Sequence, residues 1–420
     1  MSNSLNGYLG SLVAAGGGKI HTGPFGSQLH ASDYVQQGLP CIMPANMKNS
    51  RVDLSNIAFI TDEDAKRLSK YIVKADDIVY SRRGDVTQKA LIREREAGYF
   101  CGTGCLLLRP GKKFDARYLT YYLSIPRIQN WIVSQAIGAT MPNLNTGILS
   151  SIPFHGPEKT EQEKIANVLS VVEEKIELNN SINAELEAMA KTLYDYWFVQ
   201  FEFPGANGKP YKSSGCKMEY NPALKREIPE GWNVTPLSKI TPVSNQSVNP
   251  ADYHDKVFRH FSIPIYDATK TFGLEAGQTI GSNKFIVKEN DIMVSKLNPW
   301  FSRVIYAMEE EDIICSTEFV VWRTPNSSIK NFLYMVARSP QFIAHCTQSA
   351  TGTSNSHKRV NPGVMMRFEI PFKEEIASAL GEKIEPMIKQ MVINQRENIE
   401  LAKLRDWLLP MLMNGQVTVK

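Results

Sequence analysis

Short apolar runs and amphipathic stretches alternate along most of this 420-residue chain. Apolar runs bounded by turn-forming residues predict strands at 56–60, 77–81 and 105–110. Residues 115–124 and 126–136 predict two consecutive helices, the first capped by Asp115 and the second with Pro126 in its first turn. The alternation of the two element types predicts a mixed α/β (α+β) fold.

Two long segments carry apolar residues at steps of three or four and predict long helices. The first, 161–198, lacks glycine and proline, and "TEQE" before it predicts a capping box with Thr160 as the cap. The second, 374–413, contains Pro386, which predicts a bend. Neither helix buries its stripe alone, so we expect the two to pair. The stripe residues expected to form the spacer and to dock partners are Ile165, Leu169, Ile176, Leu186, Leu193, Ile384, Ile388, Leu404 and Leu408.

One position on the first stripe is polar. Asn179 is either a frayed or bent point of the helix or a residue that fixes the register against a partner helix, and the sequence leaves both interpretations open.

A repeat with a constant offset divides the chain. "DIVYSRRGDVTQKALI" (77–92) and "DIMVSKLNPWFSRVIY" (291–306) share a frame, and the step from Asp77 to Asp291 recurs from Cys101 to Cys315 and from Pro126 to Pro340. A period this long indicates tandem domains rather than a solenoid. We therefore predict two globular domains, each followed by a helical segment, with the boundaries 1–158, 159–203, 204–372 and 373–420.

Charge separates the same segments. The formal net charge of +4 divides into +5 for 1–158, −5 for 159–203, +4 for 204–372 and zero for 373–420. Basic globular segments suit a polyanionic partner, although this excess is mild. Six scattered cysteines without a CxxC pair fit reduced thiols, and neither a secretory start nor an apolar span is evident. We expect a cytoplasmic protein that makes no membrane contact.

Several stretches resemble the specificity subunit of type I restriction-modification systems. They include "GPFGSQLHASDYVQQGLPCIMPANM" (23–47), "MPNLNTGILSSIPF" (141–154), "EQEKIANVLSVVEEKIELNNSINAELEAMAKTLYDYWF" (161–198) and "LRDWLLPMLMNGQV" (404–417). The likeness covers nearly the whole chain and rests on the order and duplication of these stretches.

The resemblance implies two target-recognition domains, each reading one part of a split site in double-stranded DNA. It also implies an antiparallel coiled coil of the two long helices, which separates the domains and docks two modification (methyltransferase) subunits. Restriction subunits would join through the complex. S-adenosylmethionine and ATP with Mg²⁺ would then be bound only by those partners, and this chain would need no cofactor of its own.

The turn after each repeated strand is the candidate DNA-binding site. Arg82 and Arg83 suit guanine edges or phosphates, and Gly84 allows close approach. The alternative is a solvated hairpin in which Asp85 pairs with an arginine. The loops at 138–145 and 352–362 are either DNA-facing tips or turns that close onto the last strand. The candidate DNA-binding residues are Arg82, Arg83, Gly84, Lys89, Asn143, Asn145, Lys296, Asn298, Arg303, Lys358 and Arg359.

Signatures of catalysis are weak in this sequence. "NPW" at 298–300 is one proline short of an amino-methyltransferase motif, no "GxxxxGK[ST]" phosphate loop is present, and the seven histidines lack metal-ligand spacing. We therefore predict a DNA-recognition subunit that is not an enzyme. The alternatives are a coiled-coil protein–protein adaptor without DNA specificity and a stand-alone methyltransferase with an unrecognised cofactor site.

Overall fold

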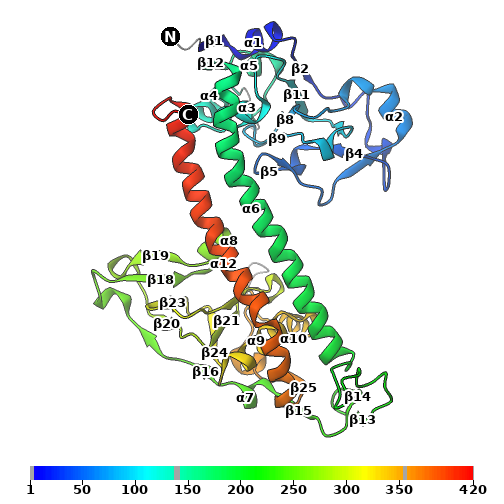
Figure 1. Ribbon diagram of the computed structural model, residues 1–420, viewed down its shortest axis with the longest axis vertical. Coiled ribbons are helices and arrows are strands. Elements are labelled where there is room, and N and C mark those ends of the chain that lie inside the picture. Colours follow the sequence, from blue (N-terminus) through cyan, green and yellow to red (C-terminus); the bar gives the residue numbers. More distant parts are fainter. Residues whose placement is uncertain (1–3, 137–141, 353–356, 420) are drawn as a thin grey trace. The chain divides into compact units, whose positions relative to one another are not determined.

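The computed structural model describes residues 4–136, 142–352 and 357–419 (Figure 1). The chain forms two compact units: the first comprises Met1–Lys175 with Leu401–Lys420, and the second comprises Ile176–Glu400. Each unit contains sheets and helices, which confirms the mixed α/β fold. Among the described residues, no helix is both long enough and apolar enough to span a membrane.

Two four-stranded sheets form the centre of the first unit. One is antiparallel and has the strand order β2 (Lys19–Thr22), β11 (Cys105–Arg109), β8 (Ile78–Ser81), β9 (Lys89–Leu91). The other has the order β10 (Phe100–Cys101), β4 (Leu39–Ile42), β7 (Ala58–Ile60), β3 (Tyr34–Val35). A further antiparallel pair joins β1 (Ser4–Tyr8) to β12 (Pro153–Pro157).

The helices of the first unit are short except for the one that leaves it. They are α1 (Leu9–Ala15), α2 (Asp62–Arg67), α3 (Ala116–Tyr122), α4 (Pro126–Gln135), α5 (Thr146–Ser150) and the start of α6 (Lys159–Tyr194). The carboxylate of Asp115 accepts a hydrogen bond from the Tyr118 N–H at 3.0 Å and caps α3, and Pro126 opens α4. Both helix starts were predicted from the sequence.

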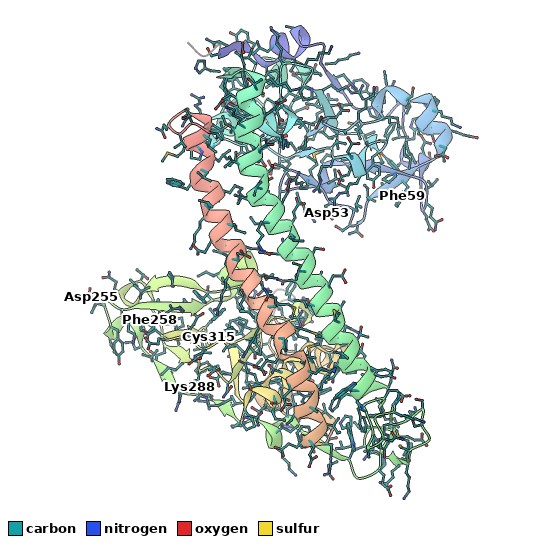
Figure 2. The ribbon with its side chains drawn as sticks, in the orientation of Figure 1. Asp53, Phe59, Asp255, Phe258, Lys288 and Cys315 are labelled. Atoms are coloured by element: carbon teal, nitrogen blue, oxygen red, sulfur yellow. The ribbon has the colours of Figure 1, made fainter. Side chains whose placement is uncertain are left out.

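The second unit repeats this plan. Its four-stranded sheet has the order β16 (Val243–Ser244), β24 (Phe319–Arg323), β21 (Asp291–Ser295), β22 (Val304–Tyr306). Its other sheet has five strands, β17 (Ser247–Val248), β20 (Lys284–Ile286), β23 (Ile313–Cys315), β18 (Val257–Phe261) and β19 (Gly273–Ala276). Figure 2 shows Phe258 and Cys315 on two adjacent strands of this sheet. The pair β15 (Asn233–Pro236) and β25 (Glu369–Phe372) matches β1 and β12.

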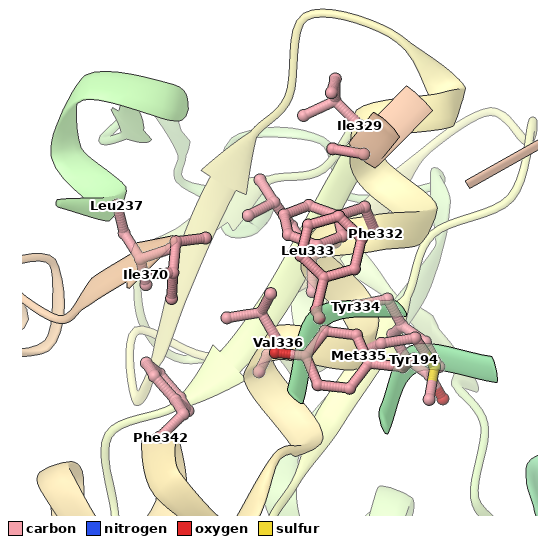
Figure 3. Packing of buried hydrophobic residues seen from close by; sticks show 14 of the residues in the cluster. Tyr194, Leu237, Ile329, Phe332, Leu333, Tyr334, Met335, Val336, Phe342 and Ile370 are labelled. Atoms are coloured by element: carbon pink, nitrogen blue, oxygen red, sulfur yellow. The ribbon is translucent and has the colours of Figure 1, made fainter. Parts of the chain in front are cut away.

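A hairpin and several helices complete the described part of this unit. The hairpin pairs β13 (Met218–Asn221) with β14 (Arg226–Pro229). The helices are α7 (Leu237–Ile240), α8 (Ile263–Thr269), α9 (Ser327–Arg338), α10 (Pro340–Gln348), α11 (Pro362–Met365) and α12 (Glu374–Met413), whose residues from Leu401 on belong to the first unit. Ile329, Phe332, Leu333 and Val336 recur at helical spacing on α9 and are fully buried (Figure 3). They pack with Leu237, Phe342 and Ile370 in the core of this unit.

One ion pair marks the repeat inside both central sheets. Arg109 on β11 meets buried Asp77 just before β8, with 3.1 Å between Nε and Oδ2. Arg323 on β24 meets buried Asp291 on β21, with 2.8 Å between Nη2 and Oδ2. Both members of the second pair stand at the predicted offset from those of the first. The duplication inferred from the sequence is therefore present in the strand order and in the side-chain chemistry.

Both long helices are present, although their details correct the sequence analysis. α6 begins at Lys159, and the Glu158 carbonyl accepts from the Gln162 N–H at 3.0 Å, so Thr160 lies inside the first turn and the predicted capping box is wrong. A π-helical turn, Asp195–Val199, ends the segment. α12 continues as a helix through Pro386.

The apolar stripes mostly pack into the globular cores. Ile165 and Leu169 are buried in the first unit with Leu412 and Met413, and Leu408 packs against the same cluster. Ile384 and Ile388 are buried in the second unit, where Leu186 and Leu193 pack against that core. Ile176 is half-buried. Leu404 is exposed, as is Trp407 three residues later, so no core of this chain covers Leu404, and its role in docking a partner stays a prediction.

Asparagines form the seam between α6 and α12 in the second unit. Asn179 is fully buried and donates to Glu397 Oε2 at 2.7 Å and to Asn398 Oδ1 at 2.9 Å. Asn183 Oδ1 accepts from Asn394 Nδ2 at 2.8 Å. Residue numbers fall on α12 as they rise on α6, so the helices are antiparallel here. These cross-helix bonds favour the interpretation of Asn179 as a residue that fixes register, because another register would leave buried amides unpaired.

Candidate nucleic-acid interface

Backbone hydrogen bonds hold the residue after β8 from two sides. The Arg82 N–H donates to the Gly104 carbonyl at 2.8 Å, and the Arg82 carbonyl accepts from the Leu144 N–H at 2.8 Å. The turn after β8 is thereby joined to the loop before α5. This fixes the start of the turn although the turn itself lies at the surface.

The side chains of this turn differ in exposure. Arg82 is half-buried; its Nε donates to Asn143 Oδ1 at 3.3 Å, and its guanidinium carbon lies 5.7 Å from the centre of the exposed Phe25 ring. Arg83 and Gly84 are exposed. Gly84 has φ +77°, and a Cβ there would meet nothing within 4 Å. Glycine is therefore favoured at this position by the backbone conformation and not by a lack of space.

Asp85 stabilises the turn itself. Its Oδ1 accepts from the Thr87 N–H at 3.0 Å and from the Thr87 hydroxyl at 2.6 Å, and these hydrogen bonds lower the pKa of the carboxyl. The carboxylate therefore orders residues 85–87, and Arg83 is left with no ion-pair partner among the described residues.

Two other candidates in the first unit have structural environments. Lys89 lies on β9, is 3% exposed, and has its Nζ 5.8 Å from the centre of the Tyr80 ring. Burial lowers the pKa of its ammonium to about 8. Asn145 caps α5, its Oδ1 accepting from the Ile148 N–H at 2.8 Å. The group brought together at the surface is therefore Arg82, Arg83, Gly84 and Asn143. Residues 138–141 of the adjoining loop lie outside the described residues.

The second unit repeats the same backbone arrangement. The Lys296 N–H donates to the Glu318 carbonyl at 3.0 Å, and the Lys296 carbonyl accepts from the Val360 N–H at 3.0 Å. Lys296 and Glu318 correspond to Arg82 and Gly104 at the offset of the repeat. The loop before α11 is joined to the turn after β21, as the loop before α5 is joined to the turn after β8.

Asn298 is the centre of this second arrangement. It is 8% exposed, its N–H donates to the Lys358 carbonyl at 2.7 Å, and its Oδ1 accepts from the Lys358 N–H at 3.1 Å. Asn298 therefore positions the two loops. Residues 353–356 of the second loop lie outside the described residues.

The cations of the second unit fall into two classes. Arg303 forms two 2.7 Å hydrogen bonds with Asp267, and Arg359 pairs with Glu318 at 2.9 Å. Lys296 and Lys358 are half-exposed, and within the described residues neither ammonium forms an ion pair. The sequence analysis missed the exposed aromatic residues beside these cations, Phe25 in the first unit and Trp300 and Phe301 in the second. Two consecutive aromatics inside a predicted turn were the available signal.

Metal-ligand geometry is absent from the described part of the chain, residues 4–136, 142–352 and 357–419: no three or more His, Cys, Asp or Glu side chains there are arranged to hold an ion. Each unit thus has one basic surface turn held by a second loop, and these two turns are the candidate DNA-binding sites.

Several known proteins are similar to this chain over most of its length. Residues 30–188 match the family described as "Type I restriction modification DNA specificity domain". The MjaIX specificity subunit of Methanocaldococcus jannaschii is 25% identical over 92% of this chain and 89% of its own length. The HindI specificity subunit of Haemophilus influenzae is 22% identical over 89% of this chain and 92% of its own.

Over most of its length the chain is similar to type I restriction-modification specificity subunits. The solved S subunit from M. genitalium has the same fold, with a TM-score of 0.63 and 16% identity over 98% of this chain and 96% of that one. The region of this chain that matches the family includes the basic turn at 82–84 and much of α6.

The buried ammonium of Lys89 predicts a pH-dependent stability. Its pKa is about 8 when folded against 10.5 in the ordinary state, so between these values the unfolded chain binds a proton that the folded chain does not. The free energy of unfolding therefore rises with pH between about 8 and about 10.5 because of this group. At pH 7 the full destabilisation that comes from burying the charged Lys89 ammonium is present. Lys89→Met should raise the thermal unfolding midpoint at pH 7, with the difference from wild type shrinking towards pH 10.

The matched control is Lys66→Met, which replaces an exposed lysine of the same unit and should change the midpoint little at any pH. A Lys89→Met difference that stays constant from pH 7 to pH 10 would contradict this explanation.

Proposed function

We propose that this chain is the DNA-recognition subunit of a type I restriction-modification complex and that each globular unit reads one part of a bipartite site. The repeated arrangement of Arg82 and Lys296 carries this proposal. A surface turn held from two sides presents cations at a defined position, which sequence reading requires and general charge attraction does not.

The chemistry of the two turns suits duplex DNA. Arginine side chains donate bidentately to the O6 and N7 atoms of guanine in the major groove, and lysines bind phosphates or guanine. Arg83, Lys296 and Lys358 have no ion-pair partner among the described residues, so binding DNA would not require breaking such a pair. The differences between the turns suit two half-sites of unequal sequence.

The subunit acts within a larger complex and leaves the chemistry to its partners. Two modification subunits would bind S-adenosylmethionine, and restriction subunits would bind ATP with Mg²⁺. Such a complex would act on DNA in the cytoplasm.

An exposed apolar stripe on α6 supports the docking of modification subunits. In the second unit, Leu178, Ile182 and Met189 on α6 recur at steps of four and seven, and Tyr196 in the following π-helical turn comes seven residues later; each is more than a third exposed. A helical stripe of this kind is the type of face that a partner helix covers. The same stripe also serves the alternative function, a protein–protein adaptor without DNA specificity. Salt dependence separates the two functions, because the logarithm of a DNA-binding constant falls linearly with the logarithm of the salt concentration.

Removing the two arginines of the first turn tests DNA recognition. Arg82→Ala combined with Arg83→Ala should weaken binding of the assembled complex to its specific duplex at least tenfold, because a bidentate base contact contributes roughly 1 to 3 kcal/mol. The measurement is the dissociation constant as a function of salt, where fewer phosphate contacts should also flatten the slope.

Lys112→Ala with Lys113→Ala is the matched control. These two lysines follow the last residue of β11. Arg82, in contrast, is bonded to Gly104, which precedes the first residue of β11, so the lysines lie at the opposite end of the same sheet. If the arginine variant binds within twofold of wild type, the turn is a solvated hairpin.

Charges on the α6 stripe test partner docking. Ile182→Asp with Met189→Asp should abolish co-purification of the modification subunits, because each carboxylate would be buried without a partner in the complex. The isolated chain should keep its unfolding temperature, because both positions are exposed. Glu185→Ala, at an exposed polar position between them, is the control. Retention of the modification subunits by the double aspartate variant would place their binding site elsewhere.

A further inference from the structure

Two adjacent aromatic side chains are exposed in the turn between β21 and β22. Trp300 is 38% exposed and Phe301 is 59% exposed, and their ring centres lie 6.0 Å apart with a tilt of 46°. Large apolar rings in water gain free energy when another surface covers them. The corresponding turn of the first unit, residues 83–88, contains no aromatic residue.

The backbone holds these rings in place at some conformational cost. Asn298 and Ser302, on either side of the 3₁₀ turn Pro299–Phe301, both have φ +48°, in the left-handed region that non-glycine residues seldom adopt. The buried side chain of Asn298 is bonded to the backbone of Lys358, and Pro299 is buried. Such strain persists where the surroundings enforce it and is concentrated at binding sites.

The side chain of Arg303, which contacts the Phe301 ring, is held as firmly. The Arg303 guanidinium carbon lies 4.6 Å from the centre of the Phe301 ring, and Asp267 fixes it with two hydrogen bonds of 2.7 Å. Arg303 lowers the pKa of the Asp267 carboxyl, so this pair stays ionised at neutral pH. Arg303 therefore supports the ring, while its charge is balanced locally.

The charged side chains near Trp300 and Phe301 indicate the kind of surface that would cover the two rings. Lys296 begins the same turn and Lys358 lies in the loop bonded to Asn298, and among the described residues neither ammonium has an acidic partner. An apolar protein surface would have to bury these ammonium groups without compensation. A nucleic acid offers phosphates for the lysines and the faces of bases for the rings.

We propose that Trp300 and Phe301 form a wedge that contacts the base stack of the half-site read by the second unit, at a pyrimidine–purine step. This inference rests on the proposed DNA-recognition function. Pyrimidine–purine steps are the most easily unstacked, and apolar side chains inserted there partly separate the bases. Stacking of bases on aromatic side chains makes a substantial contribution to binding. The two units would thus read DNA by different means, the first through arginines and the second through an aromatic wedge as well.

The test uses the full chain assembled with its modification subunits. The probe is a duplex that contains the site identified by methylation sequencing of that complex, with 2-aminopurine placed in turn at the adenines of each half-site. Trp300→Ala with Phe301→Ala should weaken binding at least tenfold without changing the salt slope, because no charge is removed. Wild type should raise 2-aminopurine fluorescence at one step of the second half-site, and the double variant should not.

Three further variants serve as controls. Tyr220→Ala removes a tyrosine that is 67% exposed on the hairpin β13–β14 of the same unit. This variant should leave the DNA affinity and the fluorescence change as in wild type. Trp300→Phe with Phe301→Tyr keeps two rings and should restore the fluorescence change. Phe301→Ala alone removes the more exposed ring and should weaken binding while preserving the unfolding temperature.

The possible outcomes distinguish a failure of the wedge proposal from a failure of the proposed DNA-recognition function. Unchanged DNA affinity with loss of the modification subunits would overturn the proposal, because the two rings would then form a protein contact. Weaker binding by the double variant, with the wild-type fluorescence pattern retained, would also overturn it. If the wild-type complex itself shows no sequence preference, the proposed function fails and the wedge fails with it. If the double variant keeps both the sequence preference and the DNA affinity of wild type, only the wedge proposal fails.

Discussion

In each unit, the two backbone hydrogen bonds of the residue after the central strand are the constraint on which the candidate DNA-binding turn depends. In the first unit they join Arg82 to Gly104 and Leu144, and in the second they join Lys296 to Glu318 and Val360. A surface turn without such bonds samples many conformations and loses entropy when it binds. Fixed at its first residue, each turn presents its side chains in a narrower range of directions, and binding orders less of the chain.

The buried carboxylates nearby reinforce this arrangement. Asp77 and Asp291 are almost inaccessible and are paired with Arg109 and Arg323, so the central strand and its neighbour are tied at the end opposite to the turn. Removing either partner would leave a buried charge unpaired. The two turns and the loops before α5 and α11 are therefore attached to sheets whose register is fixed. The long helices extend each core, and asparagines fix their register within the second unit.

Much of this architecture was predictable because it follows from local chemistry. The constant offset of the repeat, the Asp115 cap and the helix start at Pro126 each depend on a few neighbouring residues. The predictions that failed or stay untested depend on where an element sits. Thr160 has the sequence of a cap, yet the backbone becomes helical one residue earlier, at Lys159. Leu404 follows the apolar period of its helix but is exposed, because a stripe does not specify which of its positions the neighbouring core covers.

The candidate site shows the same limit at the level of single side chains. Lys89 belongs to the basic turn in the sequence, but strand pairing places it in the interior. Asn145 and Asn298 resemble base-reading amides, and their hydrogen bonds to the backbone appear only in three dimensions. Charge and residue type located the two turns, whereas the division into presenting and supporting residues required the tertiary structure.

The most direct test of two independent readers is a domain graft followed by methylation mapping. Residues 1–158 would be replaced by the corresponding segment of a specificity subunit with a different target, and the modified sites would be sequenced. We expect one half-site to change, while the other half and the number of unread base pairs between them stay as in wild type, because α6 and α12 are retained. Simultaneous change of both half-sites would show one continuous reading surface and contradict the account.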